Sequence, residues 1–421
     1  MSKSNLISFS NKWTGGQYSL FRFIFGLYLA IHYGRILPYA RELFSNEGLI
    51  LDGKASRFVI YFLNPLAILD SPFFIKVFLI LGILASLLFA IGFRAQKNAI
   101  FLWLLGAWLF GRNPFTFMAS STTVGWLLIV QAFLPRFPYG ALETYGQNDP
   151  GSSWRMPQSI YLASWMVLLI VITYQGVSKF LNPLWLSGEA PILILNSVYV
   201  QPYFNINQIL PSAFFLYKVV AWFYMGFCAL IIPLCLFRKL RPWVWLCLLF
   251  FELSSWYFLH STEWNMGFIF LLFFTLDPGW IPAIGSGKTA KVFYDGHCGL
   301  CHRAVRFILS EDLSDIAFKF SPLQGTHFEK TFSERERQSL PDSIVLVTPN
   351  GDTKLRSESF IYILKTLGGL WRAIGVMIQW IPIAVRDGAY DIVAFLRHAL
   401  FPQPKDVCPM IPPHLRSKFD L

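Results

Sequence analysis

Residues 292–302 read Val292-Phe293-Tyr294-Asp295-Gly296-His297-Cys298-Gly299-Leu300-Cys301-His302 and contain the only two cysteines of the chain that lie three positions apart. A short apolar run precedes the glycine turn, and the apolar residues after the cysteines recur with helical spacing. The stretch therefore predicts a strand, a turn and a helix that begins at the cysteines. A helix N-terminus stabilises a thiolate through its partial positive charge and its free N–H groups. We expect Cys298 to be the exposed attacking sulfur and Cys301, one turn further in, to be the resolving sulfur.

The composition divides the 421-residue chain into two parts. Hydrophobic residues make up 55% of the chain and charged residues only 14%, whereas soluble proteins carry about 25% charged residues. The charges are unevenly spread, with 28 in the 287 residues before Lys288 and 31 in the 134 residues from there on. This distribution predicts a membrane domain over residues 1–283, with the lipid bilayer as its partner. A small, flexible linker over 284–290 and a soluble domain over 291–421 follow it.

The formal net charge of +11 does not indicate a nucleic-acid partner, because the basic residues are dispersed and several lie in loops between apolar runs. The six cysteines are too few and too scattered for a disulfide scaffold. These two observations exclude nucleic-acid binding and a small disulfide-rich fold as the main interpretations.

Eight apolar segments approach the roughly 20 residues that a membrane-spanning helix needs. They are Tyr18–Leu37, Phe73–Phe93, Asn98–Met118, Thr122–Phe137, Ile160–Phe180, Phe214–Phe237, Pro242–His260 and Asn265–Trp280. The expected fold class is therefore a multi-pass α-helical membrane domain of about eight spans. The fourth and last segments are short, so the count carries an uncertainty of one or two.

The distribution of Lys and Arg in the short loops predicts the orientation of these segments. Basic residues lie in the second loop, in the sixth loop and after the last segment, whereas the loop from Leu181 to Ser212 contains none. We therefore expect a cell inner-membrane protein with both termini in the cytoplasm. The first loop, with Arg35, Arg41 and Lys54, argues for the opposite orientation.

The soluble region has the element order of a thioredoxin-like α/β domain. Strands are expected over Lys291–Tyr294 and Ile316–Phe320, and a hairpin signal follows at Pro349-Asn350-Gly351-Asp352. The pattern βαβαββα, with the two cysteines after the first strand, predicts this fold. Pro341 precedes the third strand, where a thioredoxin fold places a cis proline that faces the disulfide.

The cysteine pair has rival interpretations. Cys298-x-x-Cys301-His302 is also a c-type haem attachment sequence, and zinc binding would need further ligands, such as Cys408 and His297. We favour the redox interpretation, with no metal, because a strand, a turn and a helix frame the pair. Arg303 adds positive charge near the helix start and is expected to lower the pKa of the thiol, unless it only forms a solvated helix face.

A second group of ionisable residues lies in the apolar region. Glu252 and His260 are eight positions apart, so they share one helix face, and ionisable groups are costly in a membrane. Together with Glu263 and Lys179 they are expected to line one outward-facing polar pocket. The alternative is that Lys179 extends to the lipid headgroups and that His260 and Glu263 mark a helix end.

The C-terminal residues carry a resemblance to a known family. The matching residues are Tyr294-Asp295-Gly296-x-Cys298-x-x-Cys301, Arg356-Ser357-Glu358-Ser359, Pro382, Arg386-Asp387-x-x-Tyr390-Asp391 and Cys408-Pro409. Residues 291–416 resemble the DCC-type thiol-disulfide oxidoreductases. The resemblance implies a thioredoxin-like domain that exchanges disulfides with a thiol or disulfide-containing protein partner at Cys298 and Cys301, supported by Asp295.

The apolar region carries a second resemblance. It rests on Phe21-Arg22, Tyr174-Gln175-Gly176-Val177-Ser178-Lys179, Trp185-x-x-Gly188, and His260 followed by Gly267. Residues 17–282 look like the HTTM domain, the membrane domain of vitamin K-dependent gamma-carboxylases and their bacterial relatives. This resemblance implies that Lys179 occupies the position of the base that deprotonates the vitamin K hydroquinone.

Three hypotheses follow. The first is a membrane-bound protein-disulfide oxidoreductase, which requires no cofactor for disulfide exchange and has a quinone as a candidate lipophilic substrate. The second is a carboxylase-like or quinone-dependent enzyme with Lys179 as base. The third is a transporter or scaffold with a redox-sensing tail.

Overall fold

The computed structural model describes residues 9–50, 52, 63–116, 118–145, 154–197, 200–201, 214–259, 262–285, 288–314, 316–340, 344–401 and 413–420. The chain divides into two compact units. Unit 1 consists of Met1–Ser10, Phe21–Leu134 and Pro157–Leu276, and unit 2 of Asn11–Leu20, Pro135–Met156 and Asp277–Leu421. This division differs from the boundaries expected at 283 and 291, because two earlier segments join the C-terminal unit and the expected linker lies inside it.

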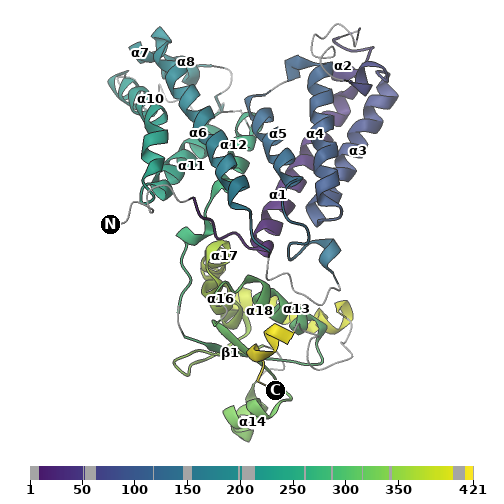
Figure 1. Cartoon of the computed structure of the whole chain (residues 1–421), viewed down its shortest axis with the longest axis vertical. Coiled ribbons are helices and arrows are strands. Elements are labelled where there is room, and N and C mark those ends of the chain that lie inside the picture. Colours follow the sequence, from purple (N-terminus) through teal and green to yellow (C-terminus); the bar gives the residue numbers. More distant parts are fainter. Residues whose placement is uncertain are drawn as a thin grey trace. The chain divides into compact units, whose positions relative to one another are not determined.

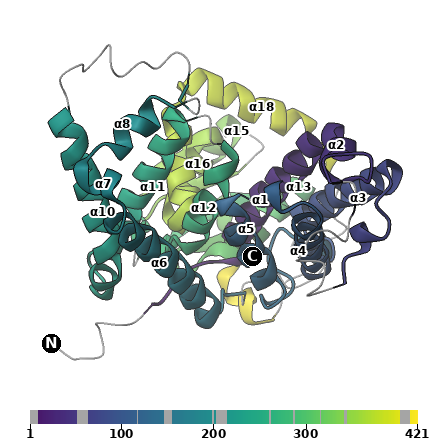
Figure 2. The ribbon, with the colours of Figure 1, turned by 90° about the horizontal axis from the view of Figure 1, so that it is seen from above.

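Unit 1 is built from helices, which Figures 1 and 2 show from two directions. They are most of α1 (Gly15–Ile36), α2 (Ala40–Phe44), α3 (Pro72–Ile91), α4 (Ala95–Arg112), α5 (Ala119–Gln131), α6 (Gln158–Phe180), α7 (Pro183–Ser187), α8 (Ala190–Leu195), α10 (Phe214–Leu236), α11 (Arg241–Phe258) and α12 (Thr262–Thr275). Each of the eight apolar segments predicted from the sequence forms a helix at a matching position.

Four of these helices are long and apolar enough to cross a membrane. They are α1 together with α2, α3, α6 and α10. Helices α5 and α12 have only 13 and 14 residues, which is short of the roughly 20 that a span requires. The predicted eight spans are therefore not confirmed, although the eight helices are.

Small residues allow close contacts between helices of unit 1. A Cβ atom on Gly26 of α1 would lie 2.6 Å from the Cβ of Ala90 in α3. A Cβ atom on Gly176 of α6 would lie 2.6 Å from the Cβ of Cys228 in α10. Any larger side chain at these positions would push the helix pairs apart, so the two glycines set the distance between their backbones.

Unit 2 contains a four-stranded mixed sheet with helices on it. Its elements are β1 (Ala290–Tyr294), α13 (Gly299–Glu311), β2 (Phe318–Pro322), α14 (Thr326–Thr331), α15 (Glu334–Ser339), β3 (Val345–Val347), β4 (Thr353–Leu355), α16 (Arg356–Leu367), α17 (Gly369–Gln379) and α18 (Ile383–Leu400). The strand order is β2-β1-β3-β4, with β1 parallel to β2 and antiparallel to β3. The predicted strands and hairpin are confirmed, whereas Pro341 lies outside the described residues.

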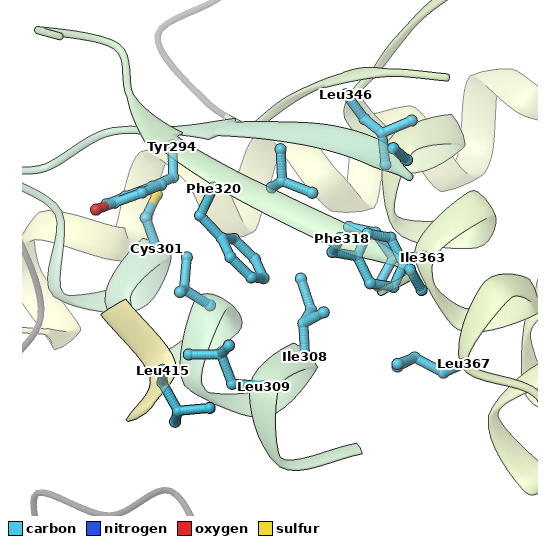
Figure 3. Close-up of a cluster of buried hydrophobic side chains, with 14 of the residues drawn as sticks. Tyr294, Cys301, Ile308, Leu309, Phe318, Phe320, Leu346, Ile363, Leu367 and Leu415 are labelled. Carbon is cyan, nitrogen blue, oxygen red and sulfur yellow. The ribbon is translucent and has the colours of Figure 1, made fainter. Parts of the chain in front are cut away.

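The alternation of side chains along β1 builds a core on each face of the sheet. Val292 and Tyr294 point into the larger cluster, where Val305 and Ile308 of α13 cover them. Figure 3 shows this cluster, with Tyr294 and Cys301 at one end and Leu367 at the other. Phe293 points to the opposite face and packs with Phe328 and Phe332. Because β1 is buried on both faces, the residues that follow it start from a fixed position.

The segment Asn11–Leu20 joins unit 2 through Glu311, the last residue of α13. The Glu311 carboxylate is fully buried and accepts hydrogen bonds from the Thr14 hydroxyl, the Gly16 N–H (2.8 Å) and the Trp371 indole N–H (2.6 Å). A carboxylate at the start of α1 satisfies free N–H groups of that helix and complements its dipole. The first turn of α1 is thereby tied to the C-terminal half of the chain.

Candidate redox site

The two cysteines occupy the first turn of α13, directly after strand β1. Cys298 is the N-cap residue, with an extended backbone, and its Sγ accepts a hydrogen bond from the Cys301 N–H at 3.4 Å. An N-cap side chain normally satisfies one of the free N–H groups of a helix with oxygen. Here the Cys298 sulfur, instead of an oxygen, satisfies the Cys301 N–H. The strand, turn and helix predicted from the sequence are confirmed.

Both sulfurs are free thiols and both are buried. Cys298 is only 1% exposed and Cys301 5%, so the expectation that Cys298 is exposed is wrong for this conformation. The reason is that the Cys298 side chain caps α13 and packs into the larger core cluster together with Tyr294 and Cys301. The surrounding residues thus cover the Cys298 Sγ.

The two thiols have opposite pKa shifts. A side-chain hydrogen bond from Cys301 is the largest cause that lowers the pKa of Cys298, from 9.0 to about 6. Burial opposes this shift, and the N–H groups of Cys301 and Leu300 reinforce it. The same hydrogen bond raises the pKa of Cys301, and burial raises it further. These opposite shifts favour a thiolate at Cys298 and a protonated thiol at Cys301, and the thiolate is the form that attacks a disulfide.

Arg397 of α18, rather than Arg303, supplies the positive charge that favours the Cys298 thiolate. The Arg303 guanidinium donates to the Tyr145 hydroxyl at 2.5 Å and lies over the rings of Tyr145 and Phe401. The expected role of Arg303 is therefore corrected. No motif or spacing indicated Arg397, because it lies 99 positions after Cys298 and only the packing of α18 on α13 brings it near.

Asp295 holds the turn that carries the cysteines. Its Oδ1 accepts hydrogen bonds from the His297 N–H and from the Gln324 side-chain amide, both at 3.0 Å. The Gln324 Oε1 in turn accepts from the Gly296 N–H at 3.1 Å. Asp295 is only 4% exposed, so these bonds have little competition from water. Gln324, just after β2, is a positioning residue that the sequence did not single out.

The histidines near the cysteines do not gather around the sulfurs as metal ligands. His302 is buried, with its ring edge-on to Tyr294, and the ring of His297 lies on the Asp295 side of the turn. Within the described parts of the chain, no group of three or more His, Cys, Asp and Glu side chains is arranged to hold a metal ion. Cys408, which a zinc site would need as a further ligand, lies outside the described residues.

Lys179 lies at the end of α6 in unit 1, and its side chain is next to aromatic rings. Its Nζ donates to the Gln175 carbonyl at 3.2 Å and stands 5.1 Å and 5.3 Å from the ring centroids of Trp185 and Tyr224. Two aromatic faces thus hold the ammonium group by cation–π attraction. Lys179 and Trp185 are close in the sequence, within the stretch from Gln175 to Gly188. Tyr224 comes from the separate helix α10.

The other members of the expected polar pocket are only partly described. Glu252 lies on α11, and its backbone carbonyl accepts from the Asn265 side chain at 3.4 Å. Electrostatic interactions connect both Lys179 and Glu252 to the Tyr224–Cys228 pair. His260 and the side chain of Glu263 lie outside the described residues, so the pocket remains a prediction.

The geometry defines a class of site: a dithiol in the first turn of a helix that follows the central strand of a mixed sheet, with one lowered and one raised pKa. The family of DCC1-like thiol-disulfide oxidoreductases matches residues 292–403. The chain belongs to this family through that C-terminal region.

Two relatives share the same region. A chloroplastic DCC family protein of Arabidopsis thaliana is 28% identical over 114 residues, which cover 27% of this chain and 66% of the relative. The uncharacterized protein YuxK of Bacillus subtilis is 31% identical over 132 residues, which cover 30% of this chain and 91% of YuxK. The chain thus spans just under two thirds of the first relative and nearly all of the second. No solved structure matches the chain.

Proposed function

We propose that the protein is a membrane-bound thiol-disulfide oxidoreductase whose active dithiol is Cys298 and Cys301. The observation that carries this proposal is the position of the Cys298 Sγ, which caps α13 and accepts the Cys301 N–H. Its lowered pKa makes it a thiolate near neutral pH. The mixed sheet with the order β2-β1-β3-β4 supports a thioredoxin-like fold for this unit.

The proposed reaction reduces a disulfide in a protein partner. The Cys298 thiolate attacks one sulfur of that disulfide, a mixed disulfide forms, and the other sulfur leaves as a thiolate. Cys301 then loses its proton and attacks the Cys298 sulfur, which releases the second sulfur of the partner. Two electrons pass to the partner, which takes one proton from Cys301 and one from solvent because Cys298 starts as a thiolate, and Cys298 and Cys301 become a disulfide. The reverse sequence oxidises a dithiol partner.

The raised pKa of Cys301 fits the order of these steps. While Cys298 is a thiolate, its charge and its hydrogen bond keep Cys301 protonated. Formation of the mixed disulfide removes that charge, so the pKa of Cys301 falls at the moment when it must attack. The pair therefore starts in the state that favours attack by Cys298 and changes to the state that favours resolution by Cys301.

The helices of unit 1 support the membrane part of the proposal. Four of them are long and apolar enough to span a bilayer, and the loop charges favour an inner-membrane protein with cytoplasmic termini. When the reaction runs in reverse and oxidises a dithiol partner, Cys298 and Cys301 end as a dithiol. A quinone in the bilayer would then be a suitable electron acceptor, because it takes up the two electrons and two protons that are released when the disulfide re-forms. The resemblance of residues 17–282 to the HTTM domain supports this coupling.

The proposal is tested by trapping the mixed disulfide. In the full-length Cys301→Ser variant, the complex with a protein partner cannot resolve. We expect a band of higher mass on non-reducing electrophoresis of membranes that disappears with reductant, and linkage of the partner through Cys298 by mass spectrometry. The matched control is Cys298→Ser/Cys301→Ser, which should trap nothing. A Cys301→Ser variant that traps no partner, with thiol labelling of the wild type that does not change with redox state, would contradict the proposal.

A further inference from the structure

Helix α18 of unit 2 directs its charged side chains toward the rest of that unit. It packs on α16, where Arg386 pairs with Glu358 at 3.9 Å and Asp391 with Arg356 at 3.6 Å. Further along the helix, the Arg397 side chain is buried. A helix on the surface of a water-soluble domain normally has the opposite arrangement, with its charged residues facing outward. The outward face of α18 is therefore left to apolar residues.

The exposed apolar surface begins where α17 ends and continues along α18. All six residues of the run 380–385 are apolar and exposed, and we call them the apolar tip: Trp380-Ile381-Pro382-Ile383-Ala384-Val385. Trp380 and, further along α18, Phe395 are each 84% exposed. Exposed residues also recur at i, i+4, i+7 and i+11 and so form one stripe of α18, namely Val385, Ala389, Ile392 and Leu396. A continuous apolar surface of this kind marks a site of association.

The start of α17 is bound to the first turns of helix α1. The Gln17 side-chain oxygen accepts a hydrogen bond from the Leu370 N–H at 3.3 Å, and both residues belong to unit 2. Helix α1 begins at Gly15 and, together with α2, is one of the four segments long and apolar enough to cross a membrane. Its first turns mark the level at which such a span enters the bilayer, so α17 starts at that level.

The composition of the tip suits a lipid head-group region better than a protein partner. Helix α17 has 11 residues and is therefore about 16 Å long, so the tip lies within one short helix of the level at which α1 starts. An indole favours the boundary between lipid and water, and aliphatic side chains next to it gain by leaving water. The Trp380 N–H is the one side-chain hydrogen-bonding group of the tip, whereas protein interfaces carry about one hydrogen bond per 100–200 Å².

We propose that the apolar tip and the exposed stripe of α18 insert into the head-group region of the bilayer that α1 enters. This inference rests on the membrane part of the proposed function and is independent of its redox part. Arg397, which acts electrostatically on Cys298, belongs to the same helix. Docking of α18 therefore holds the dithiol beside the membrane surface, where it meets partners that are themselves membrane-bound.

The test is photocrosslinking of the full-length protein in phosphatidylcholine nanodiscs. A benzophenone amino acid replaces Trp380 or, in a second protein, Phe395. After irradiation we expect an adduct with the mass of one phospholipid, located to the substituted position by mass spectrometry. The matched control carries the same group in place of Gln338, an exposed residue of α15 that lies beside Leu340 and the core on the other face of the sheet. It should form no lipid adduct.

Charge substitutions then test whether apolar insertion holds the surface at the bilayer. Val385→Asp places a carboxylate in the tip and should lower the yield of lipid adduct from position 395 severalfold, because a charge is costly in lipid. Gln338→Asp adds the same charge on α15 and should leave that yield unchanged. High salt should also leave it unchanged, since burial of apolar surface is not screened. Cys298→Ser should have no effect, because the thiol takes no part in docking.

The inference is overturned if the protein is retained in nanodiscs but position 380 crosslinks to helices of unit 1, to a second copy of the chain or to nothing. Equal adduct yields for Val385→Asp and Gln338→Asp would overturn it as well. A chain that is not retained in nanodiscs at all would contradict the membrane part of the proposed function, and this inference with it. Loss of disulfide exchange with lipid adducts intact would contradict the redox part alone.

Discussion

The turn at Cys298 and the end of α6 at Lys179 both present a candidate nucleophile or base, yet their surroundings differ in kind. The Cys298 Sγ receives its main stabilising bonds from residues two and three positions later in the chain. Lys179 instead meets the aromatic faces of Trp185 and Tyr224. The start of α13 lowers the pKa of Cys298 through residues adjacent in the sequence, whereas the surroundings of Lys179 depend on a ring from α10, a helix distant in the sequence.

The difference between the two regions is tested most strongly by removing the Cys298 thiol and the Lys179 amine in separate variants. Cys298→Ser should lower the rate of disulfide exchange by about three orders of magnitude or more, because the attacking thiolate is lost. Lys179→Ala should leave the rate unchanged. The measurement is reduction of a disulfide-linked peptide by the full-length protein in detergent, with expression of both variants checked by immunoblot. A large loss with Lys179→Ala would show that the two regions act together.

Removal of the hydrogen bond between the thiols should have the next largest effect. Cys301→Ala eliminates the main cause that lowers the pKa of Cys298, so that pKa should rise from about 6 towards 9.0. Because the thiolate is the charged form, a higher pKa means less thiolate at neutral pH, by up to about 100-fold at pH 7. The rate of iodoacetamide alkylation at Cys298 as a function of pH, followed by mass spectrometry, measures the shift. An unchanged midpoint would mean that the helix start alone sets the pKa.

The turn that carries the cysteines should respond less strongly. Asp295→Ala removes the acceptor for the His297 N–H and for the Gln324 amide, so we expect the exchange rate to fall by about 10- to 100-fold through misplacement of Cys298. Asp295→Asn keeps an acceptor oxygen and should retain most of the activity. Equal losses in both variants would indicate that the charge of Asp295, rather than its hydrogen bonds, matters.

The smallest effect is expected from the arginines near the site. Arg397→Gln should raise the pKa of Cys298 slightly, because a positive charge that favours the thiolate is lost. Arg303→Gln is the matched control, since Arg303 contacts Tyr145 and Phe401, and it should leave the pKa unchanged. The same alkylation profile distinguishes the two variants, and a larger shift for Arg303→Gln would reverse the assignment.

The local part of the redox site could be read from the sequence. An apolar strand, a glycine turn and a helical pattern after two cysteines determine where Cys298 and Cys301 lie, because the chain supplies these partners within a few residues. The eight helices and the hairpin at Gly351 were predictable for the same reason. Hydrophobic periodicity and turn chemistry are local signals.

The remaining features depend on contacts between distant segments. Arg397 and Gln324 reach the site from α18 and from the end of β2, and residues Asn11–Leu20 join unit 2 through Glu311. No spacing in the sequence indicates such contacts. The burial of Cys298 was missed because a motif indicates which atoms react, but not which core residues pack around them.

The most direct test of the central claim is the pH dependence of Cys298 alkylation in the reduced, full-length wild-type protein. We expect a single rise in the alkylation rate with a midpoint near pH 6 and a plateau above it, and no such rise in Cys298→Ser. Burial slows the whole profile because the reagent must reach the sulfur, and its upward effect on the pKa is already included in the midpoint near 6. A midpoint near 9.0, the ordinary value for a thiol, would contradict the claim that the start of α13 and Cys301 together make Cys298 the attacking thiolate.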